Sequence, residues 1–377
     1  ATTPMSETAF NAMKPWLTEN YGNPSSLYRI GRAAKEALND ARTVVGKCLN
    51  AAEPVNEKND YAPGEIVFTG GGSQADNLAI RGFMHGPSSK GRKHIITSKI
   101  EHHAVLYTCE ALEKEGYRVT YLNVDKEGRV DLEQLKAELS EDTALVSVMA
   151  ANNEIGTIQP IKQIAELAHS VGAKFHTDAV QAVGHMHIDV QEMGIDMLSL
   201  SGHKFRGPRG TGVLYVKKGI TLEPLVYGGG QERGMRPGTE AVPNIAAFAK
   251  ACEIRMAHFD EDYAHVQELA DYLKQQVAAE LPDAVINGEG DIPHVVNLSM
   301  PGCKSEVMLH VLEGDEVYIS SGSACSKGKQ SGVLKALGLP KARTDSALRV
   351  SFAPFNTKED VDAFVAAVKK GAKMFRR

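Results

Sequence analysis

Short apolar runs alternate with amphipathic stretches from residue 65 to residue 216 of the chain. The apolar runs are typical of buried strands, and the amphipathic stretches have the period of helices. The expected strands are Glu65–Phe68, His94–Ser98, Tyr117–Leu122, Ala144–Ala150, Lys174–Thr177, Asp196–Leu200 and Val213–Val216. The expected helices between them are Gln74–His85, Ala104–Glu115, Leu132–Leu139 and Ile161–Val171. Strand followed by helix, repeated in this way, predicts an α/β fold with a mostly parallel sheet covered on both faces.

The pattern changes after Tyr227, where the glycine-rich segment Gly228–Glu240 predicts a loop. The elements expected beyond it are helices at Val242–His258 and Asp260–Leu281, a strand at Val295–Met300, a short helix, a strand at Glu316–Ile319, a loop at Ser320–Ser331, a strand at Ala347–Phe352 and a helix at Thr357–Phe375. This order predicts a smaller α+β unit. We expect a large domain over 14–250 and a small domain formed by 1–13 and 251–377, which carries the second loop.

Composition narrows the class of protein. With 42% hydrophobic and 24% charged residues and a net charge of -5, the chain is typical of a soluble enzyme and not of a nucleic-acid binder. No apolar run approaches the length of a membrane span, and no signal peptide is visible. The five cysteines are odd in number and widely spaced, which favours a reducing cytoplasm over disulfides. No cysteine or carboxylate stands at ligand spacing beside the adjacent histidines, so we expect no metal site.

Lys204 directly follows His203 and lies between the expected strand Asp196–Leu200 and a glycine-rich stretch, within the segment SLSGHKFRGPRGTG (Ser199–Gly212). A lysine at the mouth of a strand can form a Schiff base with an aldehyde cofactor, which points to pyridoxal phosphate (PLP). Ligands of α/β folds bind at the carboxyl ends of the strands. Taken alone, the motif also fits a surface lysine in a basic loop, so segments elsewhere in the chain must decide.

The segments that follow two other expected strands contain residues that suit the binding of PLP. In TGGGSQADN (Thr69–Asn77), three glycines at a helix N-terminus allow backbone amides to approach an anion, although a tight turn explains them equally well. In FHTDAVQAVG (Phe175–Gly184), Asp178 can hold the pyridine nitrogen of PLP protonated, and Gln181 can donate to the ring oxygen. The alternative for Asp178 is a helix cap.

Two more motifs follow strands. His102, in KIEHHAV (Lys99–Val105), can stack on a flat cofactor and carry protons near neutral pH, or it is one of two surface histidines. Asn153, in ANNEIGTIQPI (Ala151–Ile161), can bond a ring oxygen, although its neighbours are typical turn formers.

Cys325 lies in a loop of small residues, YISSGSACSKGKQSG (Tyr318–Gly332). Structural cysteines usually lie in apolar elements, whereas Lys327 and Lys329 favour a thiolate here, so Cys325 is the candidate reactive thiol. Arg349 stands in an otherwise apolar strand and needs a partner. A bidentate clamp on a substrate carboxylate and a structural salt bridge both remain open.

Six segments together resemble the cysteine desulfurases of the NifS/IscS type, which are fold-type-I PLP enzymes of the class-V aminotransferase superfamily. The resemblance spans essentially the whole chain and implies a large domain with a seven-stranded sheet. The last segment separates desulfurases from related aminotransferases. The segments are YGNPSS (Tyr21–Ser26), EHHAV (Glu101–Val105), ANNEIG (Ala151–Gly156), SGHK (Ser201–Lys204), GGGQERGMRPGTE (Gly228–Glu240) and SSGSAC (Ser320–Cys325).

The resemblance implies a role for each matching residue. Lys204 would be the Schiff-base lysine, Asp178 the partner of the pyridine nitrogen, His102 the group that stacks on the ring, and Cys325 the sulfur-accepting nucleophile. The other implied roles are Asn153 and Gln181 at the ring hydroxyl, Gly72, Ser73, Ser201 and His203 at the phosphate, Thr239 at the phosphate of the neighbouring subunit of a homodimer, and Asn23 and Arg349 at the carboxylate of cysteine.

The implied reaction converts L-cysteine to L-alanine. Lys204 removes the α-proton, and the Cys325 thiolate then takes the substrate sulfur as a persulfide. The glycines around Cys325 suit a loop that must carry this sulfur to an acceptor protein. An iron–sulfur scaffold, a tRNA-thiolation enzyme and a carrier of a thiamine pathway all remain open as acceptors.

The chain departs from the family pattern at several points. The family begins with a strand that reads Tyr-Leu-Asp-Asn-Ala-Ala-Thr-Thr-Pro, of which only Ala1–Pro4 is present, so we expect the native start to be missing. Ser73 replaces a common threonine and keeps its hydroxyl, and Ala241 stands where asparagine is frequent. The cysteine loop is shorter than in some IscS proteins. The chain also ends at Arg377 without the long tail that helps to dock scaffold proteins in the family.

Rival functions remain. A class-V aminotransferase would not need Cys325, and a selenocysteine lyase would turn cysteine over poorly. A non-catalytic sulfur-assembly subunit would be expected to lack Lys204 or Cys325, yet both are present. A plain nucleotide-binding module is disfavoured because no dinucleotide fingerprint follows the first strand.

Overall fold

The computed structural model describes residues 1–51, 65–322 and 331–375, and two β-sheets organise this part of the chain. The larger sheet has seven strands in the order β1-β7-β6-β5-β4-β2-β3. Its strands are β1 (Ile66–Thr69), β2 (His94–Ser98), β3 (Arg118–Leu122), β4 (Thr143–Ser147), β5 (Lys174–Asp178), β6 (Met197–Ser201) and β7 (Gly212–Val216). Because β7 alone runs antiparallel to its neighbours, the other six strands all end at one edge. The predicted α/β class and mostly parallel seven-stranded sheet are confirmed.

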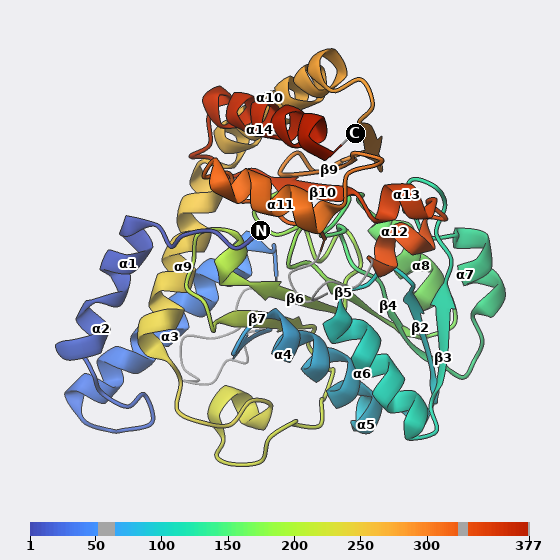
Figure 1. The fold of residues 1–377 in the computed structure, drawn as a ribbon. Coiled ribbons are helices and arrows are strands. Elements are labelled where there is room, and N and C mark those ends of the chain that lie inside the picture. The colour runs from blue at the N-terminus through green and yellow to red at the C-terminus, as the bar shows by residue number, and fades with distance from the viewer. Residues whose placement is uncertain (52–64, 323–330, 376–377) are drawn as a thin grey trace.

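Helices cover both faces of the larger sheet (Figure 1). They are α1 (Glu7–Met13), α2 (Pro15–Thr18), α3 (Arg29–Cys48), α4 (Gly72–Asn77), α5 (Phe83–His85), α6 (His103–Lys114), α7 (Leu132–Glu138), α8 (Ile161–Ser170) and α9 (Val242–Ala257). Alternate strand residues point to opposite cores. Val67 and Leu145 pack toward α4 and α6, whereas Phe68 and Val146 pack toward α3, α8 and α9. This alternation explains why the central strands are buried along almost their whole length.

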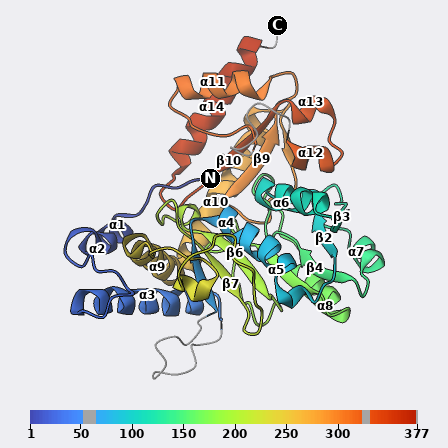
Figure 2. The same ribbon diagram turned by 90° about the horizontal axis from the view of Figure 1, so that it is seen from below.

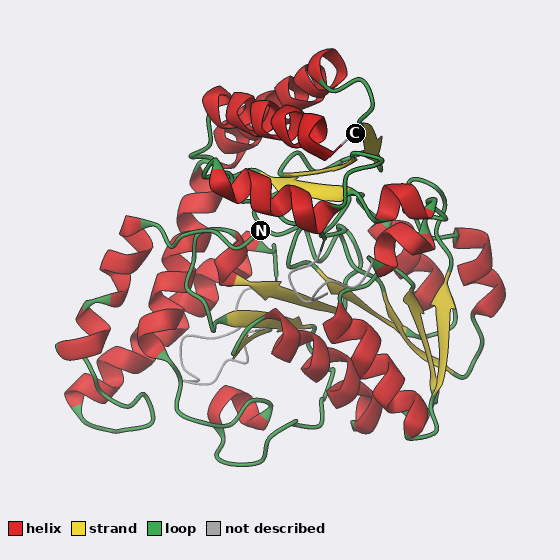
Figure 3. Ribbon diagram, in the orientation of Figure 1, coloured by secondary structure: helices red, strands yellow, loops and turns green. Residues whose placement is uncertain are grey.

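The smaller sheet is antiparallel, with the order β10-β9-β8, and lies beyond the carboxyl edge of the larger one (Figures 1 and 3). Its strands are β8 (Val285–Asn287), β9 (Val295–Ser299) and β10 (Ala347–Ser351), and the helices after α9 are α10 (Phe259–Glu280), α11 (Ser305–Gly314), α12 (Gly332–Ala336), α13 (Lys341–Thr344) and α14 (Lys358–Phe375). Leu273 of α10, Leu298 of β9 and Val368 of α14 share its core. The core of the larger sheet includes Ala9 and Cys252. The domain division that we place at residues 13 and 250 stays a prediction.

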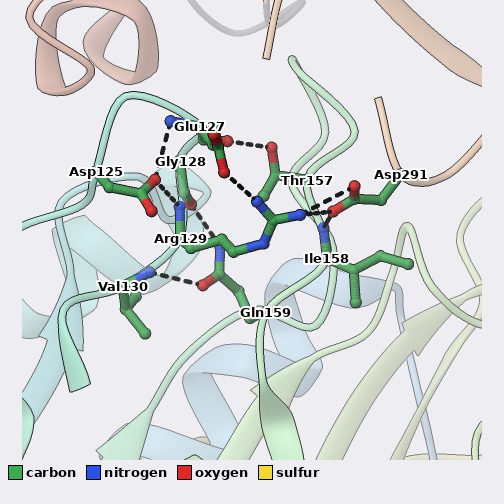
Figure 4. Close-up of polar contacts among 9 residues, drawn as sticks. All are labelled: Asp125, Glu127, Gly128, Arg129, Val130, Thr157, Ile158, Gln159 and Asp291. Atoms are coloured by element: carbon green, nitrogen blue, oxygen red, sulfur yellow. Dashed lines mark hydrogen bonds and ion pairs between the residues drawn. The ribbon is translucent and has the colours of Figure 1, made fainter. Parts of the chain in front are cut away.

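Contacts of two kinds, apolar and polar, are among those that join the two sheet units. Leu334 of α12 packs on Met149 and Ile155 from the larger unit. Nη2 of Arg129 donates to both carboxylate oxygens of Asp291, at 3.1 Å each. Asp291 also accepts a bond from the Ile158 amide at 2.8 Å (Figure 4). Figure 2, the view from below, draws α12 next to α6.

One predicted strand is wrong. Residues Glu316–Ile319 form no ladder, and only Ser320 makes a single bridge, to Arg349. Glu316 has a positive φ of 58°, and its amide bonds to Glu313 to close the end of α11. This left-handed turn is incompatible with an extended strand at that position. The short strand β8 was not predicted, because only Asn287 among its three residues is buried.

Candidate active site

A cavity of about 490 Å³ lies where the ends of the parallel strands face the smaller sheet. Its volume is within the range of sites for cofactors and small substrates. Ten of the residues predicted from the sequence line it, and they come from segments spread across the chain: Gly72, Ser73, His102, Asn153, Asp178, Gln181, Ser201, His203, Lys204 and Arg349. The structure therefore brings together groups that were proposed separately from strand ends.

Lys204 lies on the single 3-10 turn Gly202–Lys204 that follows β6. Gly202 makes this turn possible, since a Cβ there would meet the ring of Phe248 at 2.7 Å and the backbone of Pro208 at 3.1 Å. The carbonyl of Lys204 accepts a bond from His185 at 3.3 Å. The turn thus fixes the backbone from which the lysine side chain enters the cavity.

Asp178 ends β5 and is buried, with one carboxylate oxygen 2.9 Å from the Val180 amide that donates to it. Burial raises the pKa of Asp178, while the nearby His102 and Lys204 lower it. A buried carboxylate of this kind is stabilised by a cation. The second acid in the cavity, Asp76, is also buried, and its pKa is raised well above the ordinary value by burial and by Asp178.

His102 caps the start of α6, where its Nδ1 accepts a bond from the Ala104 amide at 3.1 Å. This bond places the proton of a neutral ring on Nε2 and fixes the ring plane. Burial lowers the pKa of His102, and Asp178 opposes that shift. Glu101 beside it is buried and accepts bonds from the Ser98 hydroxyl and the Met149 amide, and burial raises its pKa to about 8. Sequence reasoning missed Glu101 and Asp76.

The glycine-rich turn after β1 forms one end of the cavity. Gly71 has a φ of 140°, and a Cβ on Gly72 would meet the Val180 side chain at 2.7 Å. Only glycine fits such a close approach. The exposed Ser73 side chain and the buried Ser201 lie at this end, which suits a phosphate held by hydroxyls and backbone amides.

Arg349 reaches the opposite side of the cavity from β10. Its Nη1 donates to the Asn153 carbonyl at 3.0 Å, and its buried Nε has no hydrogen-bond partner in the described part of the chain. Burial lowers the pKa of Arg349, and Glu154 opposes the shift. An unused donor on a buried guanidinium can bind a carboxylate, so this geometry supports the predicted clamp on the substrate carboxylate. The alternative, a structural ion pair with Glu154, also stays open.

Two predicted residues do not line this cavity, and a third lies outside the residues that the structure describes. Asn23 is exposed and uses its side-chain oxygen to accept a bond from the Ser25 amide at 2.9 Å. Thr239 is also exposed and does not line the cavity of its own chain. Cys325 lies outside the described residues, although Ser320, just before its loop, lines the cavity and pairs with Arg349. The roles of all three stay predictions.

Comparison with known proteins fits this geometry. A family model described as aminotransferase class-V matches residues 1–364. A protein named cysteine desulfurase IscS, from Clostridium botulinum strain Hall, is 46% identical over all of this chain and 94% of its own length. A solved structure named NIFS-like protein superposes with a TM-score of 0.89 at 34% identity, covering 98% of this chain and 96% of that one. Another, SspA in complex with cysteine, has a TM-score of 0.81 at 34% identity, covering 94% of this chain and 98% of that one.

The chain belongs to the cysteine desulfurases of the aminotransferase class-V family. Enzymes of this family depend on PLP, and the cavity suits that cofactor. Gly72 leaves room for a phosphate beside its backbone, and Asp178 has a carboxylate oxygen beyond the one bonded to Val180. A protonated ring nitrogen would supply the cation that this buried carboxylate needs. The predicted cofactor is thus consistent with the residues present.

The described residues contain neither a membrane-spanning helix nor a metal-binding cluster. No helix there is both long enough and apolar enough to cross a membrane. Within the same residues, no group of three or more His, Cys, Asp or Glu side chains has the arrangement of a metal site.

Proposed function

We propose that this protein converts L-cysteine to L-alanine with PLP as cofactor and transfers the sulfur to Cys325 as a persulfide. The carbon–sulfur bond of the substrate breaks and a sulfur–sulfur bond forms at Cys325. One cysteine and one thiol give one alanine and one persulfide, so atoms and electrons balance without a further reactant. The observation that carries the proposal is that Lys204, Asp178 and Arg349 line one cavity. The SspA structure with cysteine supports the choice of substrate.

Each residue of the cavity has a role that follows from its position. PLP, when bound, supplies an electron sink for charge at the α-carbon of the substrate. Lys204 carries the cofactor and then moves the α-proton, and Asp178 keeps the ring nitrogen protonated. Arg349 orients the substrate carboxylate from β10, while His102 covers the ring with a fixed imidazole. Gly72, Ser73, Ser201 and His203 hold the phosphate, and Asn153 and Gln181 contact the ring hydroxyl.

We infer that the working protein is a homodimer in the cytoplasm. Thr239 is exposed and does not line the cavity of its own chain, which suits a residue that reaches the phosphate of a second copy. The four cysteines that the structure describes are free, as expected in a reducing compartment. The persulfide would pass to an acceptor protein, and iron–sulfur cluster assembly and the thiolation of tRNA or cofactors are both consistent with it. Light scattering of the purified protein tests the dimer, since a monomer at micromolar concentration contradicts it.

The reaction is tested by measuring alanine and sulfide from L-cysteine after PLP is added to the purified protein. Lys204→Ala is expected to abolish the visible absorbance of the bound cofactor. Cys325→Ser is expected to keep that absorbance and stop sulfide release. Cys303→Ser, a buried cysteine of the smaller unit, is the matched control and should keep both signals. Full sulfide release by Cys325→Ser would refute the persulfide step.

The same assay separates the rival activities. Alanine formed from cysteine without a keto acid excludes an aminotransferase. A rate with selenocysteine far above a negligible rate with cysteine would instead identify a selenocysteine lyase.

A further inference from the structure

Two buried histidines lie directly behind the cavity, and the catalytic roles above use neither. His185 is 8% exposed and His294 is 3% exposed. Their rings stack with centroids 3.5 Å apart and planes 18° from parallel. They come from different units, because His185 follows β5 in the larger unit and His294 stands just before β9 in the smaller one.

Each histidine makes one hydrogen bond to a group of the site. The Nε2 of His294 lies 3.1 Å from Oε1 of Gln181, and the Nε2 of His185 lies 3.3 Å from the carbonyl oxygen of Lys204. Because both partners are acceptors, both rings must carry their proton on Nε2. The Nδ1 of His294 is buried without a hydrogen-bond partner in the described residues, as expected of an unprotonated nitrogen.

The surroundings keep both rings neutral. Burial lowers the pKa of His185 to about 3 and that of His294 well below its ordinary value. The charged groups that face the pair are Arg255 and Lys204, and both oppose a further positive charge. A proton on the Nδ1 of His294 would also be buried without an acceptor. The pair therefore behaves as a fixed set of donors throughout the neutral range.

We propose that His294 is a positioning residue that fixes the orientation of the Gln181 amide, and that His185 braces it by stacking. An amide has one oxygen and one NH₂ group at its end, and either can face the cavity. With its oxygen held by His294, Gln181 has only its NH₂ group left to donate toward the ring oxygen of PLP. The proposal rests on the proposed PLP-dependent function.

The test uses the absorbance of the bound cofactor as a function of pH, without substrate. A donor at the ring oxygen withdraws charge from it and so weakens its hold on the proton that it shares with the Lys204 nitrogen. His294→Phe keeps a ring that stacks on His185 but removes the donor. The midpoint of the absorbance change should rise by about half a pH unit to one unit, and PLP should bind about three- to tenfold more weakly.

A double-mutant cycle separates positioning from general damage to the fold. In a Gln181→Leu background, His294→Phe should no longer shift the midpoint, because the amide through which it acts is gone. His294→Gln, which restores an NH₂ donor, should recover part of the wild-type midpoint. His94→Phe replaces a buried histidine of β2 that bonds Thr143 and Thr120, away from the cavity, and should leave the midpoint unchanged.

Each outcome bears on a separate claim. If the wild-type protein shows no cofactor absorbance, the proposed function fails. If the wild type titrates and His294→Phe titrates at the same pH, or shifts equally in both backgrounds, the positioning role is overturned. Should His294→Phe not fold, ¹⁵N NMR of histidine-labelled wild-type protein gives a second reading. A proton on Nδ1 of His294 would overturn the proposal, since that tautomer cannot donate to Gln181.

Discussion

Glu101 shows how a single buried side chain makes stability depend on pH. Burial raises its pKa to about 8, against an ordinary value of 4.5. Between these values the unfolded chain releases the proton and the folded chain keeps it, so unfolding becomes easier as the pH rises. We expect Glu101→Gln to remove this pH dependence. In the wild type, the free energy of unfolding should fall by a few kcal/mol, on the order of what the pKa shifts of buried acids imply.

Urea denaturation at pH 5 and pH 8 measures the effect. As the pH increases, the free energy of unfolding of Glu101→Gln should rise relative to that of the wild type. Wild-type and variant values that change in parallel over this range would contradict a protonated Glu101.

Gly72 illustrates a steric limit at one atom. A Cβ there would lie 2.7 Å from Cγ2 of Val180, so Gly72→Ala must displace a residue that lines the cavity. The variant should lose about 1–3 kcal/mol of stability and bind PLP more weakly. Gly46→Ala is the matched control, because nothing lies within 4 Å of a Cβ at that position of α3. Absorbance titration with PLP checks both, and equal affinity in the two variants would refute the steric argument.

At the scale of elements, an ion pair between the partly exposed Arg42 and the buried Glu232 ties α3 to β1 and to the glycine-rich segment. Glu232 accepts bonds from Arg42 and from the Phe68 amide, each at 2.9 Å, and Arg42 also donates to the Ile66 carbonyl at 2.6 Å. Arg42→Met would leave the Glu232 carboxylate buried without its cation. We expect a loss of about 3–5 kcal/mol in urea denaturation.

A second variant checks the cause. Arg42→Met combined with Glu232→Gln removes the charge but keeps an acceptor for Phe68, so it should be more stable than Arg42→Met alone. A double variant as unstable as the single one would show that packing, not the unpaired charge, is responsible.

Elements buried on both faces could be predicted well from the sequence. Lys174–Thr177 and Asp196–Leu200, for example, match β5 and β6 to within a residue, and both strands are covered on their two faces. Glu316–Ile319 failed for a local reason, the left-handed residue that ends α11. The helix α3 was not predicted, although Ala34, Leu38, Ala41 and Val45 recur at its period.

The residues of the site also differ in how far the sequence could predict them. Lys204, Asp178 and His102 follow strands, and strand ends meet at one edge of a parallel sheet, so their proximity could be predicted. His294 could not, because it comes from the smaller unit 113 residues after Gln181 and no local pattern marks it. Asp76 also lacked a signal, since its burial beside Asp178 depends on how α4 packs.

At the scale of the whole molecule, the Arg129–Asp291 pair links the two units (Figure 4). Both side chains are partly exposed, so the pair is expected to contribute only about 1 kcal/mol to global stability. Its local effect should be larger, because Asp291 also holds the Ile158 amide. Asp291→Ala should speed hydrogen exchange at Ile158 more than at strand amides of β5. Unchanged exchange at Ile158 would show that the linkage does not restrain this loop.

The antiparallel strand β7 also has a consequence for the order of folding. Its pairing with β6 is local, since only residues 202–211, which include the turn that carries Lys204, separate the two strands. Its pairing with β1 joins Ile66 to Tyr215 and requires closure of a very long loop. The glycine-rich turn at one end of the cavity follows β1, whereas Lys204 follows β6. We therefore expect the β6–β7 pair, with the turn that carries Lys204, to form before β1 joins the sheet, so that binding of PLP would report one of the last steps of folding.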